Sequence, residues 1–370
     1  MLLSISNFLF YSSTGLFFFL PVYISELKVS KLYLGFIMGM PSIIQVAFGF
    51  QIRNKIDFIN KKTGLLVTSI ISIAVCIAYF FLNNIFIIPV IRFFHSLVLS
   101  VGILFGTALA IDLIPVEKRK SGIGLYSLTG ALPFLFAPMT AEIIIKHFDF
   151  KYVFILAAII SLLRFIITLT VKTNGNSASI KKQDENTKIS KYYSLIPFVI
   201  FYGALYAALY KFLSVYTIQL KIIYISIFFQ VRVIFTFLSR IVSQSKLDKW
   251  KNISILSTSF ISSFAVLFLG FILKFKPSVY ILAIMGAIYG SVHGILYPAL
   301  NVLFINITPT RTGKATIYFI LIKNIGIAVF ALLCGLIADY TGYNIMYLIM
   351  AILMLIPVLY GVFIRKRLEI

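Results

Sequence analysis

Long apolar runs alternate with short polar clusters along the whole chain. Each run is close to the about 20 residues that an α-helix needs to cross a bilayer. The first six predicted membrane-spanning helices lie near residues 3–25, 33–51, 64–82, 86–110, 121–145 and 152–171. The second six lie near residues 193–217, 222–242, 253–273, 278–305, 314–338 and 343–364. We therefore predict an all-α membrane protein with 12 transmembrane helices.

A long polar stretch from Lys172 to Lys191 separates the two sets of apolar runs. Its Asn, Ser, Gln and Lys residues are typical of a flexible linker. We predict an N-terminal six-helix bundle at residues 1–172, a cytoplasmic linker at 173–192 and a C-terminal six-helix bundle at 193–370.

An internal repeat supports this division into halves. The segment Gly-Ile-Leu-Phe at 102–105 recurs as Gly-Ile-Leu-Tyr at 294–297, an offset of 192 residues. At the same offset Arg119 corresponds to Arg311. These matches indicate duplication of a six-helix unit with parallel topology, as in several transporter folds.

The basic residues lie mostly in alternate loops. If the N-terminus is cytoplasmic, 21 Lys and Arg residues fall in the loops on that side and seven fall in the opposite loops. The positive-inside rule therefore predicts that both termini are cytoplasmic. The loops also account for the net charge of +22, so we expect no nucleic-acid binding.

The composition excludes other classes of protein. The chain has 370 residues, of which 61% are hydrophobic and 12% charged, whereas about one-quarter of a soluble domain is charged. Cys76 and Cys334 fall inside predicted spans, without the paired spacing of a disulfide or a metal site. The loops carry no His or Asp cluster of the kind that a membrane-embedded transferase needs. We expect no metal, no cofactor and no enzymatic activity.

Three short motifs lie inside the predicted spans: Arg92-Phe-Phe-His95-Ser, the stretch from Gly130 to Pro138, and the stretch from Gly335 to Asp339. They resemble the R-x-x-Q-G, G-x-x-x-G-P and eleventh-span motifs of the major facilitator superfamily. This resemblance implies two pseudo-symmetric six-helix bundles that expose a central site alternately to the two sides of the membrane.

A narrower resemblance extends over most of the chain. The segments 111–127, 297–298 and 335–347 resemble exporters of staphylopine, a nicotianamine-like metallophore. The resemblance implies outward transport. From the duplicated architecture we expect the loops that carry Asp112, Glu117, Arg119 and Arg311 to latch the cytoplasmic face in the outward-open state, although such charges are also typical of ordinary loops. Asn324 stands where an Asp is expected in that subgroup, which removes one route for protons.

Seven basic residues lie at predicted membrane depth: Arg92, His95, Arg164, Lys211, Arg232, His293 and Lys323. The acidic residues in or near the spans all lie close to span ends: Glu26, Asp112, Glu142 and Asp339. A charge at bilayer depth costs at least about 2.5–3.5 kcal/mol, so each buried cation needs a partner or a role. We predict a net positive substrate pathway formed by Arg92, His95, Lys211, Arg232, Lys323 and Asn324.

Alternatives stay open for the other intramembrane residues. Arg164 lies about seven residues from the end of its span and could extend to the headgroups. His293 is equally compatible with packing. Glu142 could pair with Lys146 one helical turn further on, or carry a coupled proton. Three tyrosines are compatible with either lining or packing: Tyr206, Tyr210 and Tyr297.

A basic pathway favours anions, because guanidinium and ammonium groups recover lost hydration by binding carboxylates or phosphates. We expect a monomeric, multi-pass secondary transporter of the bacterial plasma membrane. Its expected cargo is a small anionic metabolite, of the metallophore type by resemblance, moved outward. Two alternatives remain: a proton-coupled multidrug efflux pump, and an importer of organic anions or sugar phosphates.

Overall fold

The computed structural model describes residues 1–52, 59–82, 84–115, 119–172, 193–244, 252–307 and 312–364. Throughout these ranges the regular structure is helical, which confirms the predicted all-α class. Within them 11 helical segments are long and apolar enough to cross a membrane. The predicted span near 222–242 corresponds to α10 (Ile227–Gln244), which carries Arg232 and Arg240 and is not among the 11.

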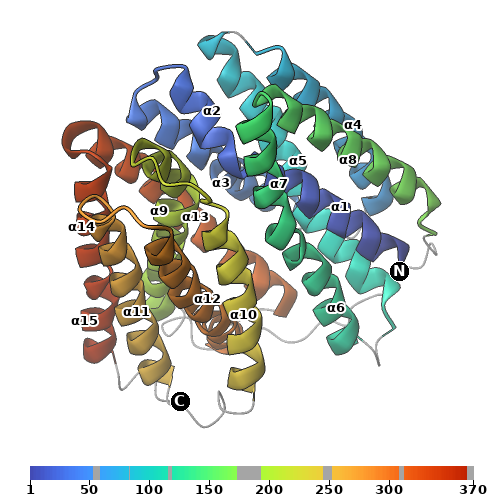
Figure 1. The fold of residues 1–370 in the computed structure, drawn as a ribbon. Coiled ribbons are helices and arrows are strands. Elements are labelled where there is room, and N and C mark those ends of the chain that lie inside the picture. Colours follow the sequence, from blue (N-terminus) through green and yellow to red (C-terminus); the bar gives the residue numbers. More distant parts are fainter. Residues whose placement is uncertain are drawn as a thin grey trace. The chain divides into compact units, whose positions relative to one another are not determined.

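The chain forms two compact units, and the first comprises Met1–Tyr23 and Met40–Lys182. Its helical elements are α1 (Leu2–Leu16), the 3₁₀ turn Phe17–Phe19, α4 (Lys61–Phe80), the 3₁₀ turn Ile85–Ile87, α5 (Ile88–Leu113), α6 (Arg119–Ala131), α7 (Pro133–His147) and α8 (Lys151–Thr170). Within this unit α1 packs on α6, α7 and α8, while α4 packs on α5 and α8 (Figure 1).

The second unit comprises Ile24–Gly39 and Gln183–Ile370. Its helices are α9 (Ile196–Gln219), α10, α11 (Asn252–Ile272), α12 (Val279–Ile307), α13 (Thr312–Thr341), α14 (Tyr343–Leu353) and α15 (Leu355–Phe363). In this unit α10 packs on α12, α9 on α13, and α11 on α12, α14 and α15 (Figure 1). Two helices contribute residues to both units, α2 (Leu20–Glu26) and α3 (Lys31–Ile52).

Three predicted spans are each divided by a short interruption, and each interruption precedes a proline. α1 ends at Leu16 before Pro21, α6 ends at Ala131 before Pro133, and α14 ends at Leu353 before Pro357. A proline has no backbone N–H to donate, and its ring clashes with the carbonyl four residues earlier. The predicted helical runs are therefore continuous in sequence but broken in structure at these points.

Hydroxyl side chains join three helices of the first unit. Ser161 on α8 lies 3.2 Å from Ser13 of α1 and 2.9 Å from Ser72 of α4, measured between their Oγ atoms. Small polar residues of this kind allow close helix approach in lipid and supply hydrogen bonds between helices. The same face of α8 carries Arg164 and Thr168, which are also buried.

Three glycines bring α12 against α10 in the second unit. Gly286, Gly290 and Gly294 follow each other at four-residue intervals, so they form one stripe on α12. A Cβ atom at Gly286 would overlap the Phe228 carbonyl, and one at Gly290 would overlap the Arg232 carbonyl. The two backbones can therefore touch only while this stripe lacks side chains.

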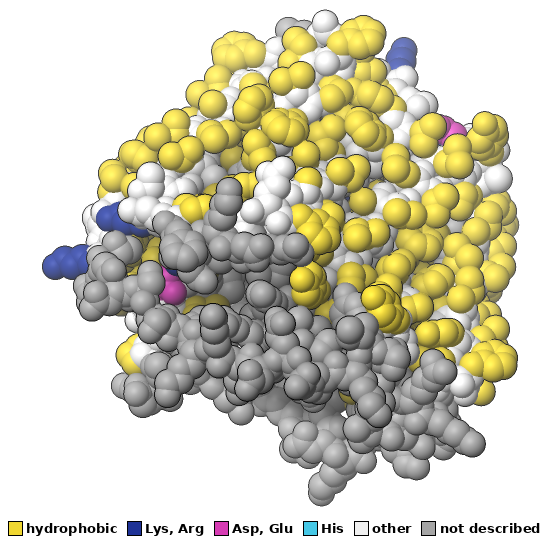
Figure 2. All heavy atoms as spheres, turned by 180° about the vertical axis from the view of Figure 1, so that it is seen from behind, with side chains coloured by type: hydrophobic (Ala, Val, Ile, Leu, Met, Phe, Trp, Pro, Cys, Tyr) yellow, Lys and Arg dark blue, Asp and Glu magenta, His cyan; other side chains and the backbone are white. Residues whose placement is uncertain are grey.

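The described surface is mostly apolar. On the face shown in Figure 2, hydrophobic side chains cover most of the described area, and the few charged side chains lie near its margins. Large exposed apolar residues include Phe81, Phe86, Tyr280 and Phe363. An exposed apolar surface of this extent is expected of a protein solvated by lipid.

The glycine stripe yields a stability prediction. Gly290→Ala should force α10 and α12 apart and destabilise the protein by about 1–3 kcal/mol, the usual cost of overpacking a close contact. Gly124→Ala is the matched control, because a Cβ at Gly124 meets nothing within 4 Å. That change should be neutral or stabilising by about 0.5–1 kcal/mol. Thermal unfolding in detergent measures both, and equal melting temperatures for the two variants would contradict the account.

Candidate functional site

A cluster of cations and tyrosines lies among four helices of the second unit. α9 supplies Tyr202, Tyr206 and Tyr210, and α12 supplies Tyr289, His293 and Tyr297. Each set is spaced by four residues, so each occupies one face of its helix. α10 adds Arg232 and Arg240, and α13 adds Lys323. We call these nine residues the cation–tyrosine cluster.

Arg232 is held against aromatic rings instead of a carboxylate. Its guanidinium carbon lies 5.1 Å from the ring centroid of Tyr210 and 5.7 Å from that of Tyr289. The residue is only 9% exposed, and its Nε has no hydrogen-bond partner among the described residues. The Tyr289 hydroxyl is likewise buried without a partner there. Donors left unpaired in this way are available to a ligand, and leaving them unpaired is costly.

His293 lies at the centre of the cluster. Its Nδ1 is hydrogen-bonded to the hydroxyl of Tyr202, and its ring stacks on Tyr297 with centroids 5.6 Å apart. Arg232, Arg240 and Lys323 all lie close enough to act on the imidazole electrostatically. Three cations therefore lie within electrostatic range of one imidazole, so the cluster carries a local excess of positive charge.

Lys323 and Lys211 extend the positive charge along the cluster. The Lys323 Nζ lies 5.7 Å from the ring centroid of Tyr297, and the Lys211 Nζ lies 5.7 Å from that of Tyr206. Both lysines are partly exposed, as are these two tyrosines. The cluster thus combines buried members, such as Arg232, with partly exposed members, such as Lys323.

Glycines also position Lys323. A Cβ atom at Gly203 of α9 would overlap the Lys323 carbonyl, and one at Gly326 of α13 would overlap the Ile200 carbonyl. This close crossing brings the backbone at Lys323 against α9, whose tyrosines line the cluster. Asn324, one residue further on, is buried at 2% exposure.

Arg92 and His95 form a separate pair inside the first unit. They lie one helical turn apart on α5, and both are buried. The Arg92 Nη1 lies 3.2 Å from the His95 Nδ1. Because a guanidinium can only donate, this imidazole nitrogen accepts. The His95 ring also packs against Phe17, with centroids 4.3 Å apart.

Asp112 makes an ion pair at one end of α5. Its Oδ2 lies 2.8 Å from the Nζ of Lys61, which is 6% exposed, while Asp112 is 31% exposed. Lys61 is the first residue of α4, so the pair ties the ends of α4 and α5 together.

Asp339 caps the start of α3. Its two carboxylate oxygens accept hydrogen bonds from the backbone N–H groups of Lys31 at 2.7 Å and Leu32 at 2.8 Å. A carboxylate is favoured at a helix N-terminus, where unpaired N–H groups and the helix dipole are both positive. The Lys31 Nζ donates to the Ala338 carbonyl at 2.7 Å. Gly335, one turn before Asp339, allows this approach, because a Cβ there would crowd the Lys31 carbonyl.

The other predicted motif residues are distributed differently. Gly130 faces Tyr11 and Asn7 of α1, where a Cβ would clash. Pro138 is a buried residue within α7, and Glu142 is partly exposed on the same helix. Three predicted gating positions cannot be placed: Glu117 and Arg311 lie outside the described residues, as does the side chain of Arg119.

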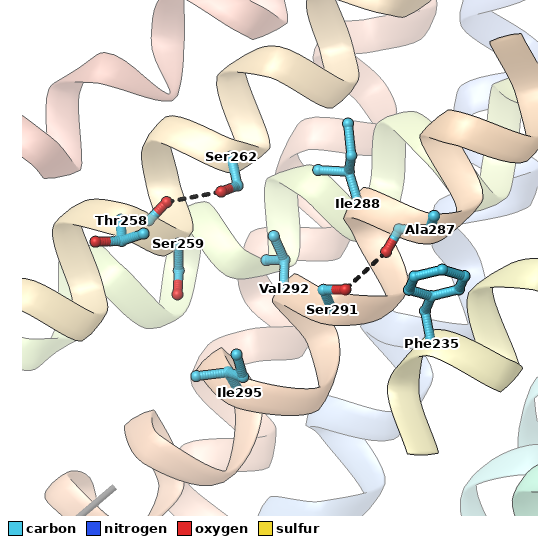
Figure 3. A pocket seen from close by; sticks show the side chains of 9 residues that line it. All are labelled: Phe235, Thr258, Ser259, Ser262, Ala287, Ile288, Ser291, Val292 and Ile295. Atoms are coloured by element: carbon cyan, nitrogen blue, oxygen red, sulfur yellow. Dashed lines mark hydrogen bonds between the residues drawn. The ribbon is translucent and has the colours of Figure 1, made fainter. Parts of the chain in front are cut away.

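The second unit also has a groove of about 340 Å³ among α10, α11 and α12 (Figure 3). Its lining is mostly apolar but includes four hydroxyl side chains, those of Thr258, Ser259, Ser262 and Ser291. The hydroxyl hydrogens of Ser262 and Ser291 are donated to the backbone of their own helices, to Thr258 and Ala287. The described residues that line the groove include no charged side chain, and none of them belongs to the cation–tyrosine cluster.

The sequence indicates Arg232 and Lys323 and leaves Tyr206, Tyr210 and Tyr297 open between lining and packing, but it does not indicate Arg240. Tyr202 and Tyr289 are missed, although each begins a four-residue repeat of aromatic residues on its helix. That repeat, and the glycine stripe of α12, are signals that could have placed the cluster. Without a partner helix in view, the same spacing is equally typical of core packing.

Comparison with known proteins defines the class. The family model described as Major Facilitator Superfamily matches residues 2–275 and 224–369. The chain belongs to the major facilitator superfamily, and it is a membrane transporter of that type. The predicted family and fold are thereby confirmed.

One relative is the staphylopine export protein of Staphylococcus aureus (strain Mu50 / ATCC 700699). It is 24% identical over 390 aligned positions, which cover 96% of this chain and 93% of that protein. This similarity agrees with the narrower resemblance in the sequence.

Solved transporter structures share the fold at low identity. A peptide transporter, POT, crystallised with sulfate, gives a TM-score of 0.82 at 12% identity, covering 100% of this chain and 94% of that one. The nucleoside transporter NupG gives 0.80 at 14% identity, covering 98% of each chain. A bacterial homolog of the human lysosomal transporter Spinster, inward-facing and unoccupied, gives 0.78 at 14% identity, covering 99% and 96%.

The Lys61–Asp112 pair yields a second stability prediction. Asp112→Asn should leave the buried Lys61 ammonium without its charged partner, at a cost of about 1–3 kcal/mol. Adding Lys61→Met removes the orphaned charge, so the double variant should recover part of the loss. Melting temperatures in detergent test this coupling. A double variant as unstable as the sum of both single variants would contradict it.

Proposed function

We propose that this transporter exports a small metabolite carrying two or more anionic groups, of the metallophore type, by alternating access. The observation that carries the proposal is the packing of Arg232 on Tyr210 and Tyr289 and of Lys323 on Tyr297, with Arg232, Arg240 and Lys323 all within electrostatic range of His293. A compound with several carboxylates can pair with several of these cations at once, whereas a hydrophobic cation would be repelled. This argues against a multidrug pump for lipophilic cations.

The tyrosine frame supports an anionic cargo because it holds Arg232 without neutralising its charge. Aromatic faces attract a cation by about 0.5–2 kcal/mol without neutralising it, as a carboxylate would. Arg232 makes no ion pair with any described residue, so its charge can be directed to a ligand. The tyrosine hydroxyls add neutral donors for further oxygen atoms of the cargo.

Outward direction rests on the similarity to the staphylopine export protein and on energetics. In a cell that is negative inside, moving one negative charge out gains about 2.3 kcal/mol per 100 mV. An anion exporter can therefore run without a carboxylate that carries protons. We keep cytoplasmic termini, bundles at 1–172 and 193–370, a monomeric state and location in a bacterial plasma membrane as parts of the proposal. Proton coupling through Glu142 and import of organic anions are the competing schemes.

Arg232 provides the direct test of cargo charge. Arg232→Ala should weaken binding of a tricarboxylate such as citrate by about 10–100-fold, the loss of one charged hydrogen-bonding group. Arg232→Lys should fall between wild type and alanine, because a lysine keeps the charge but loses the planar fork of donors. Lys276→Ala is the control, because Lys276 is exposed in the connection between α11 and α12. Transport into inverted membrane vesicles with unchanged apparent affinity for Arg232→Ala would contradict the proposal.

Membrane potential provides the test of direction and coupling. Each net negative charge exported should shift the equilibrium concentration ratio by about 50-fold per 100 mV. Proteoliposomes held at set potassium-diffusion potentials measure this shift, with the pH equal on both sides. Anion transport that does not depend on the membrane potential but is driven by a pH gradient would instead support proton-coupled exchange.

A further inference from the structure

Arg164 in the first unit is buried in a way that the proposed function leaves unexplained. It lies on the inner face of α8, is 3% exposed, and faces α1. Its guanidinium carbon sits 4.4 Å above the ring centroid of Phe10. The side chain is therefore turned into the bundle, and it does not extend along the helix to the headgroups as a lysine or arginine near a span end commonly does.

The described residues around Arg164 do not neutralise it. The groups that act on it electrostatically are two phenols, Tyr126 of α6 and Tyr11 of α1, and no carboxylate is among them. Its Nε is buried without a hydrogen-bond partner in the described part of the chain. A buried, unpaired guanidinium is unfavourable unless something supplies the missing acceptors.

Neighbouring polar groups are hydrogen-bonded to each other, and none of these bonds involves the Arg164 guanidinium. Both amide hydrogens of Asn7 are used, on the Tyr126 carbonyl at 3.0 Å and the Thr129 hydroxyl at 3.2 Å. Thr168 donates its hydroxyl hydrogen to the Arg164 carbonyl at 2.7 Å, so Ser6 must donate to Thr168 across 2.8 Å. The surroundings are polar, yet the Arg164 Nε–H has no acceptor among the described residues.

We propose that Arg164 is a second anion-binding position, which takes a carboxylate or phosphate group through its Nε and one terminal nitrogen. Nε and a terminal nitrogen form one edge of the planar guanidinium fork, and this edge matches the two oxygens of a carboxylate or phosphate. Phe10 covers one face of the guanidinium and fixes its plane. Tyr11, beside it, is partly exposed, so the position is not closed off by that ring.

The proposal rests on the proposed function, because it assigns Arg164 a further contact with the same class of anionic solute. It differs in location, since Arg164 belongs to the first unit and the cation–tyrosine cluster to the second. The source of the oxyanion can be a free inorganic ion or the transported metabolite. Inorganic phosphate and citrate are the probes that separate these sources.

The test compares Arg164→Met with Arg232→Met by thermal unfolding of the full-length protein in detergent, titrated with phosphate or citrate. Arg164→Met should be at least as stable as wild type without anion, because an apolar side chain replaces an unpaired buried charge. Its affinity for citrate should fall by at least about tenfold. Arg164→Lys should retain an intermediate affinity. Phosphate protection that depends on Arg164 assigns an inorganic ion, and protection by citrate alone assigns the metabolite.

The failures are distinguishable. If Arg164→Met melts lower without anion and binds citrate as wild type does, the residue is structural and this inference is overturned. If it does not fold, unchanged citrate affinity in Arg164→Lys overturns the inference in the same way. If Arg232→Met also binds as wild type does, the proposed function fails as well. Lys276→Met controls for loss of a positive charge at an exposed site.

Discussion

Buried cations packed on aromatic rings, and not on carboxylates, are the interaction on which the account depends. Arg232 lies over Tyr210 and Tyr289, Lys323 over Tyr297, and Arg164 over Phe10. A ring stabilises a cation while leaving its donors unused, whereas a carboxylate would occupy them. Among the described residues, the carboxylates of Asp112, Asp149 and Asp339 make their contacts at helix ends. The Nε atoms of Arg232 and Arg164 are therefore buried without an acceptor among the described residues.

Small residues allow the close helix contacts that place these cations. The α12 glycine stripe lets the backbone of α10 approach at Arg232, and the Gly203–Gly326 crossing does the same for α9 and α13 at Lys323. In lipid there is no hydrophobic driving force between helices, so close backbone contact and hydroxyl bonds such as Ser13–Ser161 supply the packing. Side chains placed by such rigid contacts are better preorganised than side chains on loops.

The length of the apolar runs is enough to predict most of the helices, because a span must be apolar over a fixed length whatever its neighbours are. It does not predict the breaks before Pro21, Pro133 and Pro357, since a proline in a span can be accommodated by a kink as well as by an interruption. The intramembrane cations also stand out in sequence, because each is a charged residue inside an otherwise apolar run. Their partners do not: the tyrosines of α9 and α12 have the spacing of ordinary core residues, and only the crossing of helices shows which face they share.

The most direct measurement is an experimental structure with bound selenate, an oxyanion that scatters X-rays anomalously. The account predicts an anomalous peak within hydrogen-bonding distance of Arg232 and next to His293, because the charge of Arg240 and Lys323 converges there. Selenate bound to the protein, with no anomalous density at Arg232, would contradict the assignment of the cation–tyrosine cluster as an anion site.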